Sequence, residues 1–402
     1  MDRNNDLGIR DKTLWGLILA VVLMMVGVGM VVALLPQRIV DLDGSGRSVG
    51  YIASAFAFSY LVLQVPIGSL SDKIGFKPLI IFGYLLCVLT GLVFYFATNS
   101  NMIFFARLLQ GAGEAPVWAL APALLSLRFP SAKGKVMGIY NAAMHIGLTL
   151  GPVLGVALAK VLNSNEVFLV YSFGCLVGAI VIYLFVDNSP KKELETTSLF
   201  DIRTIFKLIR HRQTLVSLLG ITLYGAGYGI LITNIPTFML EEKNFTSVDI
   251  GVFFSLFYVA ISLSQIITGP LSDRFGRNKF MILGLLTVTG GFIIMPAFSF
   301  PLILLVLTVA SFGMGVFYLA SMAFLYEIVP DSLKGTISGA YYLFWGSGYF
   351  FGPLIITQVA DSINFQAAMI SYSFLVLLVA FGMIMTLEWK NVVGGSPHSR
   401  QE

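Results

Sequence analysis

Charged residues are scarce in this sequence. Asp, Glu, Lys and Arg make up 11% of its 402 residues, whereas a soluble globular domain carries roughly 25%. Hydrophobic residues make up 57%, and the mean hydropathy is +0.86. This balance excludes an ordinary soluble domain and predicts a membrane protein.

Cysteine is scarce as well. Cys87 and Cys175 are the only two cysteines, and both lie inside apolar runs, where thiols usually serve as packing residues. We therefore expect neither a disulfide framework nor a metal site. The first apolar run continues far beyond the length of a signal-peptide core, so we expect no cleavable signal peptide.

Motifs for soluble chemistry are missing too. The sequence contains no phosphate-binding loop of the form G-x-x-x-x-G-K-[ST], so nothing supports an ATP-driven pump. No nucleophile–base arrangement or nucleotide fingerprint is visible. The net charge of +4 comes from basic residues in short turns, which is not a nucleic-acid-binding pattern. We expect no enzyme, no cofactor and no nucleic-acid partner.

Long apolar runs fill most of the chain. A helix needs about 20 mostly apolar residues to cross a bilayer. By this criterion we predict twelve spans, at about 14–35, 49–70, 79–97, 101–127, 136–159, 166–186, 214–239, 249–270, 280–298, 301–327, 336–359 and 365–387. We expect 49–70 and 249–270 to be the least apolar, because they contain several small or polar residues.

The positions of Lys and Arg predict the orientation. Cytoplasmic loops of membrane proteins carry an excess of basic residues. With both termini in the cytoplasm, all but five of the 25 basic residues lie in cytoplasmic segments. Those five are Arg107 within a span and Arg38, Arg47, Lys160 and Lys243 on the opposite side. We therefore expect a multi-pass inner (plasma) membrane protein with both termini cytoplasmic.

One motif occurs twice, 201 residues apart. The sequence GSLSDKIGFKP at Gly68–Pro78 returns as GPLSDRFGRNK at Gly269–Lys279. Other positions keep the same offset, namely Gly138/Gly339, Gly147/Gly348, Gly151/Gly352 and Pro152/Pro353. A fixed offset of half a chain predicts a duplicated unit.

The repeat and the spans together divide the chain. We predict a cytoplasmic N-terminus at 1–13, a six-helix bundle at 14–187, a second six-helix bundle at 214–388 and a disordered tail at 389–402. The basic segment 188–213 is the predicted cytoplasmic linker, with one short amphipathic stretch near Leu199–Ile209. A lipid-headgroup or regulatory role for that segment is the alternative to a solvated surface.

Twelve spans in two halves, each with a Gly-x-Leu-Ser-Asp turn, resemble the major facilitator superfamily over nearly the whole chain. This resemblance implies an all-α membrane protein whose two six-helix bundles surround a central cavity that opens alternately to each side. Span 5 is similar to the motif of the drug:proton antiporter branch at Gly138, Gly147, Gly151-Pro152 and Gly155. Val156 departs from that motif, which often has glycine there. Small residues of this kind let helices pack closely.

The resemblance also implies a conformational latch at the repeated turn. Asp72 would contact the start of span 11 near Gly335–Thr336, and Asp273 the start of span 5, only while the cytoplasmic side is closed. The latch residues would be Gly68, Asp72, Lys73, Gly75, Lys77, Gly269, Asp273, Arg274, Gly276 and Arg277. Phe76 replaces a usual basic residue, so we expect the first latch to be the weaker. The alternative is a turn that serves only topology.

Span 4 carries two ionisable residues. Arg107 and Glu114 are seven residues apart, so they face the same way about 10 Å apart along a helix. Arg107, Gln110 and Gly111 match the Arg-x-x-Gln-Gly pattern of the family, which usually has a small residue where this chain has Glu114. Glu114 is the only acidic residue that we place near the bilayer midplane, where ionisable groups mark proton or substrate pathways.

Three roles for Glu114 stay open. It could exchange a proton, with His145 of span 5 as a relay, or act as the counter-charge of a cationic substrate. Alternatively, it forms a permanent buried pair with Arg107 or another partner. In the first case Glu114, Arg107 and His145 couple transport to protons, and the proton is the coupling ion in place of any cofactor.

Aromatic and amide residues suit a loosely specific pocket for amphipathic, cationic molecules. The predicted substrate-binding residues are Glu114, Trp118, Tyr140, Asn141, Tyr224, Tyr228, Asn234, Tyr258, Gln265, Tyr318, Tyr342 and Trp345. The second half offers no charge at the positions equivalent to Arg107 and Glu114, which are Thr308 and Gly315.

Our hypothesis is a proton-coupled antiporter that exports amphipathic or cationic small molecules, works as a monomer and contacts membrane lipid. One alternative is a proton-driven importer of a sugar, organic acid or other metabolite, in which Arg107 binds an anionic substrate. Another is a lipid flippase or a transporter-like sensor. The direction of transport would separate the first two.

Overall fold

The computed structural model describes residues 11–43, 47–163, 165–187, 206 and 208–388. Within these residues the fold is all-α, as predicted. The helices of the first half are α2 (Lys12–Asp43), α3 (Arg47–Ile74), α4 (Phe76–Phe96), α5 (Ser100–Arg128), α6 (Lys133–Leu158) and α7 (Glu166–Phe185).

The second half repeats this arrangement. Its helices are α9 (Arg212–Ile232), α10 (Asn234–Glu241), α11 (Ser247–Phe275), α12 (Arg277–Ile294), α13 (Leu302–Ile328), α14 (Lys334–Ser362) and α15 (Phe365–Met383). The short helix α10 extends the span begun by α9, and a π-helical turn at Ile384–Glu388 extends α15. The predicted tail at 389–402 and residues 188–205 and 207 of the predicted linker at 188–213 lie outside the described residues.

Nine of the described helices are long and apolar enough to cross a membrane. The prediction that span 249–270 would be among the least apolar is wrong, because the window in α11 reaches a mean hydropathy of 2.0. The long helices that are not apolar enough to meet this criterion are α3, as expected, and also α5 and α14. All three carry buried polar side chains, including Gln64, Glu114 and Ser338. Such residues are tolerated in a membrane where they face other helices rather than lipid.

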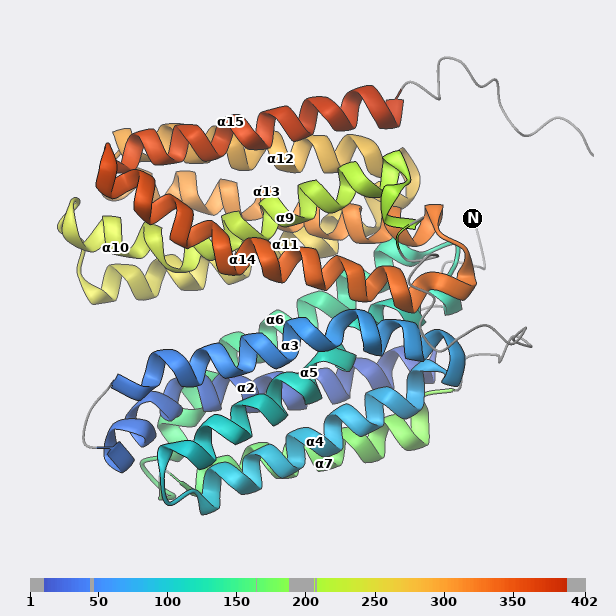
Figure 1. The fold of residues 1–402 in the computed structure, drawn as a ribbon, viewed down its shortest axis with the longest axis vertical. Coiled ribbons are helices and arrows are strands. Elements are labelled where there is room, and N and C mark those ends of the chain that lie inside the picture. Colours follow the sequence, from blue (N-terminus) through green and yellow to red (C-terminus); the bar gives the residue numbers. More distant parts are fainter. Residues whose placement is uncertain (1–10, 44–46, 164, 188–205, 207, 389–402) are drawn as a thin grey trace, which may run out of the picture.

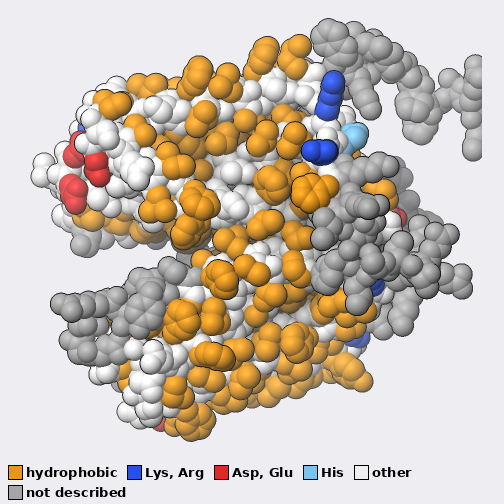
Figure 2. All heavy atoms as spheres, viewed as in Figure 1, with side chains coloured by type: hydrophobic (Ala, Val, Ile, Leu, Met, Phe, Trp, Pro, Cys, Tyr) orange, Lys and Arg blue, Asp and Glu red, His pale blue; other side chains and the backbone are white. Residues whose placement is uncertain are grey.

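The helices form two groups, α2–α7 and α9–α15 (Figure 1). Contacts between the groups run chiefly along α3 with α14 and α6 with α11. The two groups meet at the end where α14 begins and α3 ends, which we call the latch face. At the opposite end, the open face, a cleft separates them (Figure 2).

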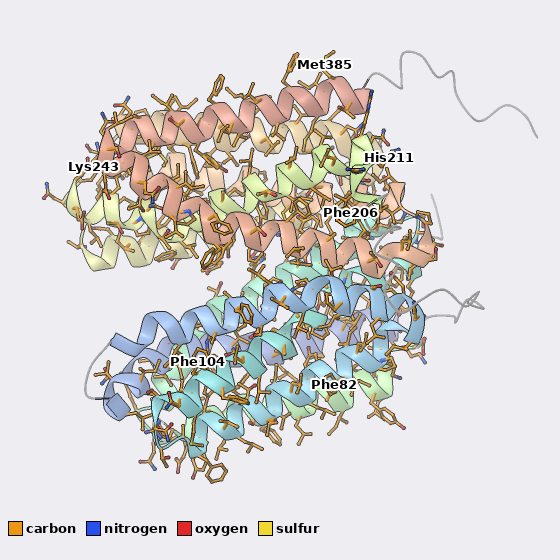
Figure 3. The ribbon with its side chains drawn as sticks, in the orientation of Figure 1. Phe82, Phe104, Phe206, His211, Lys243 and Met385 are labelled. Carbon is orange, nitrogen blue, oxygen red and sulfur yellow. The ribbon has the colours of Figure 1, made fainter. Side chains whose placement is uncertain are left out.

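Hydrophobic side chains cover the surface between the two faces (Figure 2). Large apolar side chains such as Phe82 and Met385 are exposed there, while Lys243 lies at the open face and His211 at the latch face (Figure 3). Such a band of exposed apolar residues is typical of a lipid-facing surface. On the side shown in Figure 2, acidic side chains gather at the open face and basic ones at the latch face.

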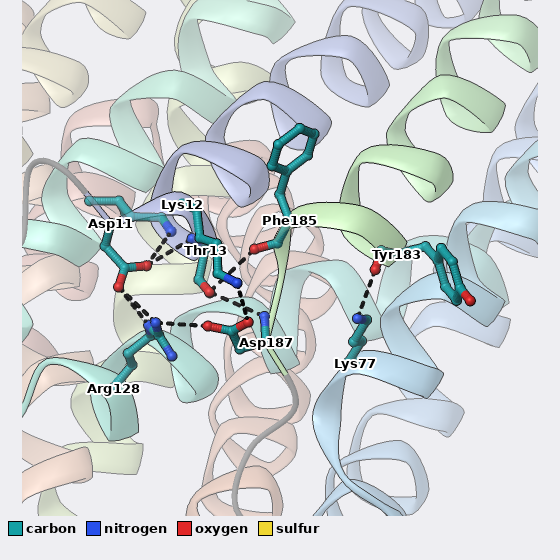
Figure 4. Close-up of polar contacts among 9 residues, drawn as sticks. Asp11, Lys12, Thr13, Lys77, Arg128, Tyr183, Phe185 and Asp187 are labelled. Carbon is teal, nitrogen blue, oxygen red and sulfur yellow. Dashed lines mark hydrogen bonds and ion pairs between the residues drawn. The ribbon is translucent and has the colours of Figure 1, made fainter.

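Ion pairs close the first bundle at the latch face. Arg128, at the end of α5, contacts Asp11 at 2.8 Å and Asp187 at 2.9 Å, and Lys12 contacts Asp187 at 2.9 Å (Figure 4). The hydrogen bond from Lys12 holds the pKa of Asp187 below its ordinary value. The backbone N–H of Asp187 donates to Thr13 Oγ1 at 3.1 Å. This cluster fixes the start of α2 to the end of α7.

The span-5 glycines lie in α6 and serve two different contacts. Gly147, Gly151 and Gly155 face α2: a Cβ atom at Gly151 would lie 2.6 Å from Cα of Gly29, and one at Gly147 would lie 2.7 Å from Cβ of Met25. Gly138 instead faces the backbone of α11 at Gln265. Of these four glycines, three therefore pack α6 closely against its own bundle and one packs it against the other bundle.

We predict that Gly151→Val destabilises the protein, because the added side chain meets backbone rather than a flexible neighbour. Overpacking of this kind typically costs about 1–3 kcal/mol. Thermal unfolding of the purified protein in detergent should show a lower midpoint. The matched control is Gly290→Ala, since a Cβ at Gly290 meets nothing within 4 Å. An unchanged midpoint in Gly151→Val would contradict the packing argument.

Candidate functional site

One face of α5 carries a ladder of four polar side chains. Arg107, Gln110, Glu114 and Trp118 are spaced three or four residues apart, so they lie above one another on the helix. Arg107 Nη1 donates to Gln110 Oε1 at 2.7 Å, and Gln110 Nε2 donates to Glu114 Oε1 at 2.9 Å. Trp118 Nε1 donates to Glu114 Oε2 at 3.3 Å. Each carboxylate oxygen of Glu114 thus accepts one hydrogen bond.

Gln110 stands between the two ionisable groups. No ion pair joins Arg107 to Glu114 in the part of the chain that the structure describes. The guanidinium of Arg107 lies 4.5 Å from the ring centroid of Phe56, and its Nε has no hydrogen-bond partner. The expected alternative of a direct permanent pair between Arg107 and Glu114 is therefore not the arrangement found.

The carboxylate of Glu114 is only 2% exposed. Both of its hydrogen-bond partners, Gln110 and Trp118, belong to α5 itself. These bonds therefore do not hold two helices together. A buried ionised carboxylate costs several kcal/mol unless it is well paired. A charge that is expensive to bury and contributes no link between helices is typical of a functional group.

A cluster of rings from the second bundle faces this ladder. Trp118 contacts Tyr342 across the bundle interface, with ring centroids 6.2 Å apart. Tyr342 shares a hydrogen bond of 2.9 Å with Tyr318, and its ring contacts Trp345 at 6.4 Å. Tyr228 contacts Trp345 at 5.9 Å and Tyr224 at 6.3 Å. We call Tyr224, Tyr228, Tyr318, Tyr342 and Trp345 the aromatic wall.

Three further predicted residues meet where α6 packs against α11. Asn141 and His145 lie one turn apart on α6, and the His145 side chain faces Gln265 of α11. The ring of His145 also lies 6.3 Å from that of Tyr258. We call Asn141, His145 and Gln265 the polar triad. No hydrogen bond joins His145 to Glu114 in the described residues, so a direct relay between them is not the arrangement seen here.

Two predicted substrate residues lie elsewhere. Tyr140 is buried between α6 and α5, where its hydroxyl donates to the carbonyl oxygen of Val117 at 3.5 Å. Asn234 begins α10 and donates to Thr357 Oγ1 at 2.8 Å. Asn234 thus fixes α10 to α14, and the structure does not bring it to the aromatic wall.

At the latch face, two carboxylates cap two helices of the opposite bundle. Asp72 accepts hydrogen bonds from the backbone N–H groups of Gly335 at 2.7 Å and Thr336 at 2.8 Å, and from Thr336 Oγ1 at 2.7 Å. Asp273 accepts from the N–H groups of Gly134 at 3.0 Å and Lys135 at 2.9 Å. These are the contacts that the family resemblance implied, and each places a negative charge at a positive helix end.

The two caps differ in their cationic neighbours. Arg277 pairs with Asp273 and with Glu327 of α13, whereas the equivalent Phe76 is a buried apolar residue. Lys77 and Arg274, which we predicted as latch residues, form no ion pair with the latch carboxylates in the described part of the chain. Lys77 donates to the carbonyl oxygen of Tyr183, and Arg274 lies over the ring of Phe275, 5.2 Å from its centroid.

Glycine is required at the break before each of α4 and α12. Gly75 has φ +93° and Gly276 has φ +89°, a region that other residues rarely adopt. Gly68 is needed for a different reason, since a Cβ there would collide with the carbonyl oxygen of Gly335. Gly75 and Gly276 thus permit the turn itself, and Gly68 lets the turn approach the opposite helix closely.

Sequence reasoning selected the buried amide of Gln265 but missed its repeat equivalent, Gln64. Gln64 and Gln265 are 201 residues apart, both are 0% exposed, and neither makes a hydrogen bond through its side chain. A Cβ at Gly339 would meet the backbone of Gln64, just as one at Gly138 would meet that of Gln265. The repeat offset was the signal that could have added Gln64 to the selected residues.

The described residues contain no group of three His, Cys, Asp or Glu that could hold a metal ion. A two-bundle membrane fold with a central buried carboxylate, an open cleft and capped helix ends defines a secondary transporter.

The comparisons with known proteins assign this transporter to a family. The model of the Major Facilitator Superfamily matches residues 17–254 and again 217–400, so the chain belongs to that family. Among relatives, the chain is 24% identical to multidrug resistance protein 1 of Bacillus subtilis, over 90% of this chain and 92% of that protein. It is 25% identical to the quinolone resistance protein NorA of Staphylococcus aureus, over 62% of this chain and 66% of that protein.

Solved structures share the fold at low identity. The human organic anion transporter MFSD10 (TETRAN) superposes with a TM-score of 0.80 at 19% identity, covering 95% of this chain and 100% of that one. The transporter FucP in its outward conformation superposes with a TM-score of 0.79 at 17% identity, covering 92% and 98%.

We predict that Asp72→Asn weakens the closed latch face, because an amide offers one acceptor where the carboxylate offers two. A cysteine replacing Ser338, which is buried against the carbonyl oxygen of Ala119, should then be alkylated by a maleimide about five- to tenfold faster, as expected for the loss of ~1 kcal/mol. Lys77→Gln is the control and should leave the rate unchanged. Equal rates with and without Asp72→Asn would show that this carboxylate does not hold the face closed.

Proposed function

We propose that this chain is a proton-coupled antiporter that exports amphipathic or cationic small molecules. The observation that carries the proposal is the buried carboxylate of Glu114, held by donors of its own helix and facing the aromatic wall of the other bundle. A cation near Glu114 would offset the cost of burying the carboxylate, and so would a proton. Because either one neutralises the same group, binding of one disfavours binding of the other, which is the requirement for exchange.

The aromatic wall supports a cationic, partly apolar substrate. Faces of Trp and Tyr attract cations at about 0.5–2 kcal/mol each and offer apolar area without fixing a single shape. The names of two relatives, a multidrug resistance protein and a quinolone resistance protein, are consistent with such a substrate range.

We further propose that the latch face is cytoplasmic, that both termini lie on that side of the plasma membrane, and that the chain works as a monomer. The excess of basic residues on that side supports the orientation. In this state the cleft opens outward. Protons from outside would then neutralise Glu114 and release the substrate. Loss of the proton to the cytoplasm, after the latch opens, would prepare the site for the next substrate.

Arg107 favours a second candidate function. Its guanidinium is partly buried and its Nε is unpaired, so it could bind an anionic group of a metabolite. In that case Glu114, through its hydrogen bond to Gln110, would help to orient the guanidinium of Arg107. Transport would then be proton-driven import of an organic acid or sugar.

We predict that Glu114→Gln abolishes proton coupling. The measurement is proton release from proteoliposomes with an imposed pH gradient, challenged with tetraphenylphosphonium. The wild type should release protons when the cation is added, and the variant should lose this signal, because an amide cannot exchange a proton. Glu166→Gln is the control, since Glu166 only caps a turn at Asn163.

Other outcomes of the same experiment are informative. Proton release that survives in Glu114→Gln would remove Glu114 from the coupling and make His145 the next residue to test. If the wild type responds to no cation, the importer is favoured, and sugars and organic anions become the substrates to test.

A further inference from the structure

The polar triad contains an unusual number of unpaired polar atoms. Asn141 Nδ2 and Oδ1, His145 Nδ1, and Gln265 Nε2 and Oε1 are all buried and make no hydrogen bond. The residues themselves are 1%, 7% and 0% exposed, respectively. Buried polar side chains are hydrogen-bonded in the great majority of cases, so a group of exceptions needs an explanation.

The repeat shows that these atoms are not a by-product of the shared fold. At the positions 201 residues after Asn141 and His145 stand Tyr342 and Gly346. Tyr342 uses its hydroxyl in a hydrogen bond with Tyr318, and Gly346 has no side chain. The equivalent contact, between α3 and α14, keeps only the glutamine of this group, because Gln64 of α3 is the equivalent of Gln265. We call the two main contacts between the bundles, α3 with α14 and α6 with α11, the bundle seams. The unpaired side chains of the polar triad therefore gather at the seam between α6 and α11.

A continuous line of side chains connects the triad to Glu114. Trp118 is hydrogen-bonded to Glu114 and contacts Tyr342 of the aromatic wall. The wall continues through Trp345 to Tyr228. From there, successive ring contacts join Tyr228 to Phe257, Phe257 to Tyr258, and Tyr258 to His145. Glu114 and the triad thus lie at the two polar ends of one line of contacting side chains.

The chemistry of the triad defines what it could bind. Two primary amides and an imidazole supply both donors and acceptors, and none of the three is a carboxylate or an obligate cation. Such a set suits a neutral group that both donates and accepts, such as a carboxamide. It offers no pairing for a second full charge.

We propose that Asn141, His145 and Gln265 form a subsite for a neutral hydrogen-bonding group, carried by an amphipathic cation whose charge is held at Glu114. This inference rests on the export of cations proposed above. It narrows the substrate class to molecules with a positive centre, an apolar aromatic body and a separate uncharged polar group. A bare lipophilic cation would bind through Glu114 and the aromatic wall alone.

The test compares matched cations. Purified full-length protein is loaded with radiolabelled tetraphenylphosphonium, which is displaced by the unlabelled compound or by derivatives that bear one para-carboxamide, attached directly or through one or two methylene groups. At least one derivative should bind the wild type about tenfold more tightly than the parent, as expected for one buried hydrogen bond. Gln265→Leu and Asn141→Leu should remove that advantage and leave the affinity for the parent within about twofold.

The repeat supplies the control. Gln64→Leu removes the equivalent unpaired amide at the seam between α3 and α14, where Gly339 packs against Gln64 as Gly138 does against Gln265. This variant should still bind the carboxamide derivative more tightly than the parent. If Gln265→Leu is not monodisperse on size exclusion, Gln265→Met keeps the side-chain length and replaces it.

Three results would overturn the inference. In the first, the parent binds but no derivative binds more tightly. In the second, an advantage persists in both Gln265→Leu and Asn141→Leu. In the third, Gln64→Leu removes the advantage as fully as Gln265→Leu, which would mean that both amides affect the packing between the bundles rather than contact the carboxamide. If tetraphenylphosphonium does not bind the wild type at all, the proposed cation export fails, and the subsite fails with it.

Discussion

Two carboxylates placed on helix N-termini of the opposite bundle determine the state of this molecule. A helix start presents unpaired N–H groups and a partial positive charge, and Asp72 and Asp273 satisfy both requirements across the seam between the bundles. Glycines at the contact remove the side chains that would keep the backbones apart. With one face closed in this way, the bundles diverge toward the other face, and the interior of the site lies at the base of the resulting cleft.

The strength of these caps must be limited. A capping interaction contributes about 0.3–2 kcal/mol, which is comparable with the differences that ligands impose on a two-state equilibrium. Stronger contacts would trap the closed face, whereas weaker ones would allow both faces to open. The buried amides Gln64 and Gln265 are relevant here, because burying unpaired polar atoms is unfavourable and opposes closure of the same seams.

Much of the fold could be predicted from the sequence because the membrane imposes simple rules. Length and hydropathy identify most spans, and the 201-residue offset identifies the two halves. The apolarity of α11 was misjudged, since its small and polar residues are outweighed by its many Ile, Leu, Val and Phe residues. The two spans that proved less apolar than we expected, α5 and α14, have polar positions that face protein, which only the packing reveals.

The sequence was enough to predict which kind of ionisable residue forms the site, but not the hydrogen bonds that its side chains make. A single carboxylate in a long apolar run identifies Glu114 without any structure. The position of Gln110 between Arg107 and Glu114 depends on side-chain conformations along α5, which the spacing does not specify. Asn234 was grouped with the substrate residues by composition alone, although its side chain joins α10 to α14. Lys77 likewise could not be placed from the sequence, because it donates a hydrogen bond to Tyr183, which is distant along the chain.

The duplication has consequences for the origin of the site. Each half retains the capping turn and the glycines, so closure of the latch face follows the internal symmetry. The interior does not follow it, because Glu114 corresponds to Gly315 and the residues of the aromatic wall belong to the second half. An ancestral pair of identical halves would have presented a substrate with two equivalent orientations. Divergence of the two copies has left an interior with its ionisable residues in the first bundle and its aromatic wall in the second, so that the two ends of an elongated ligand would meet different chemistry.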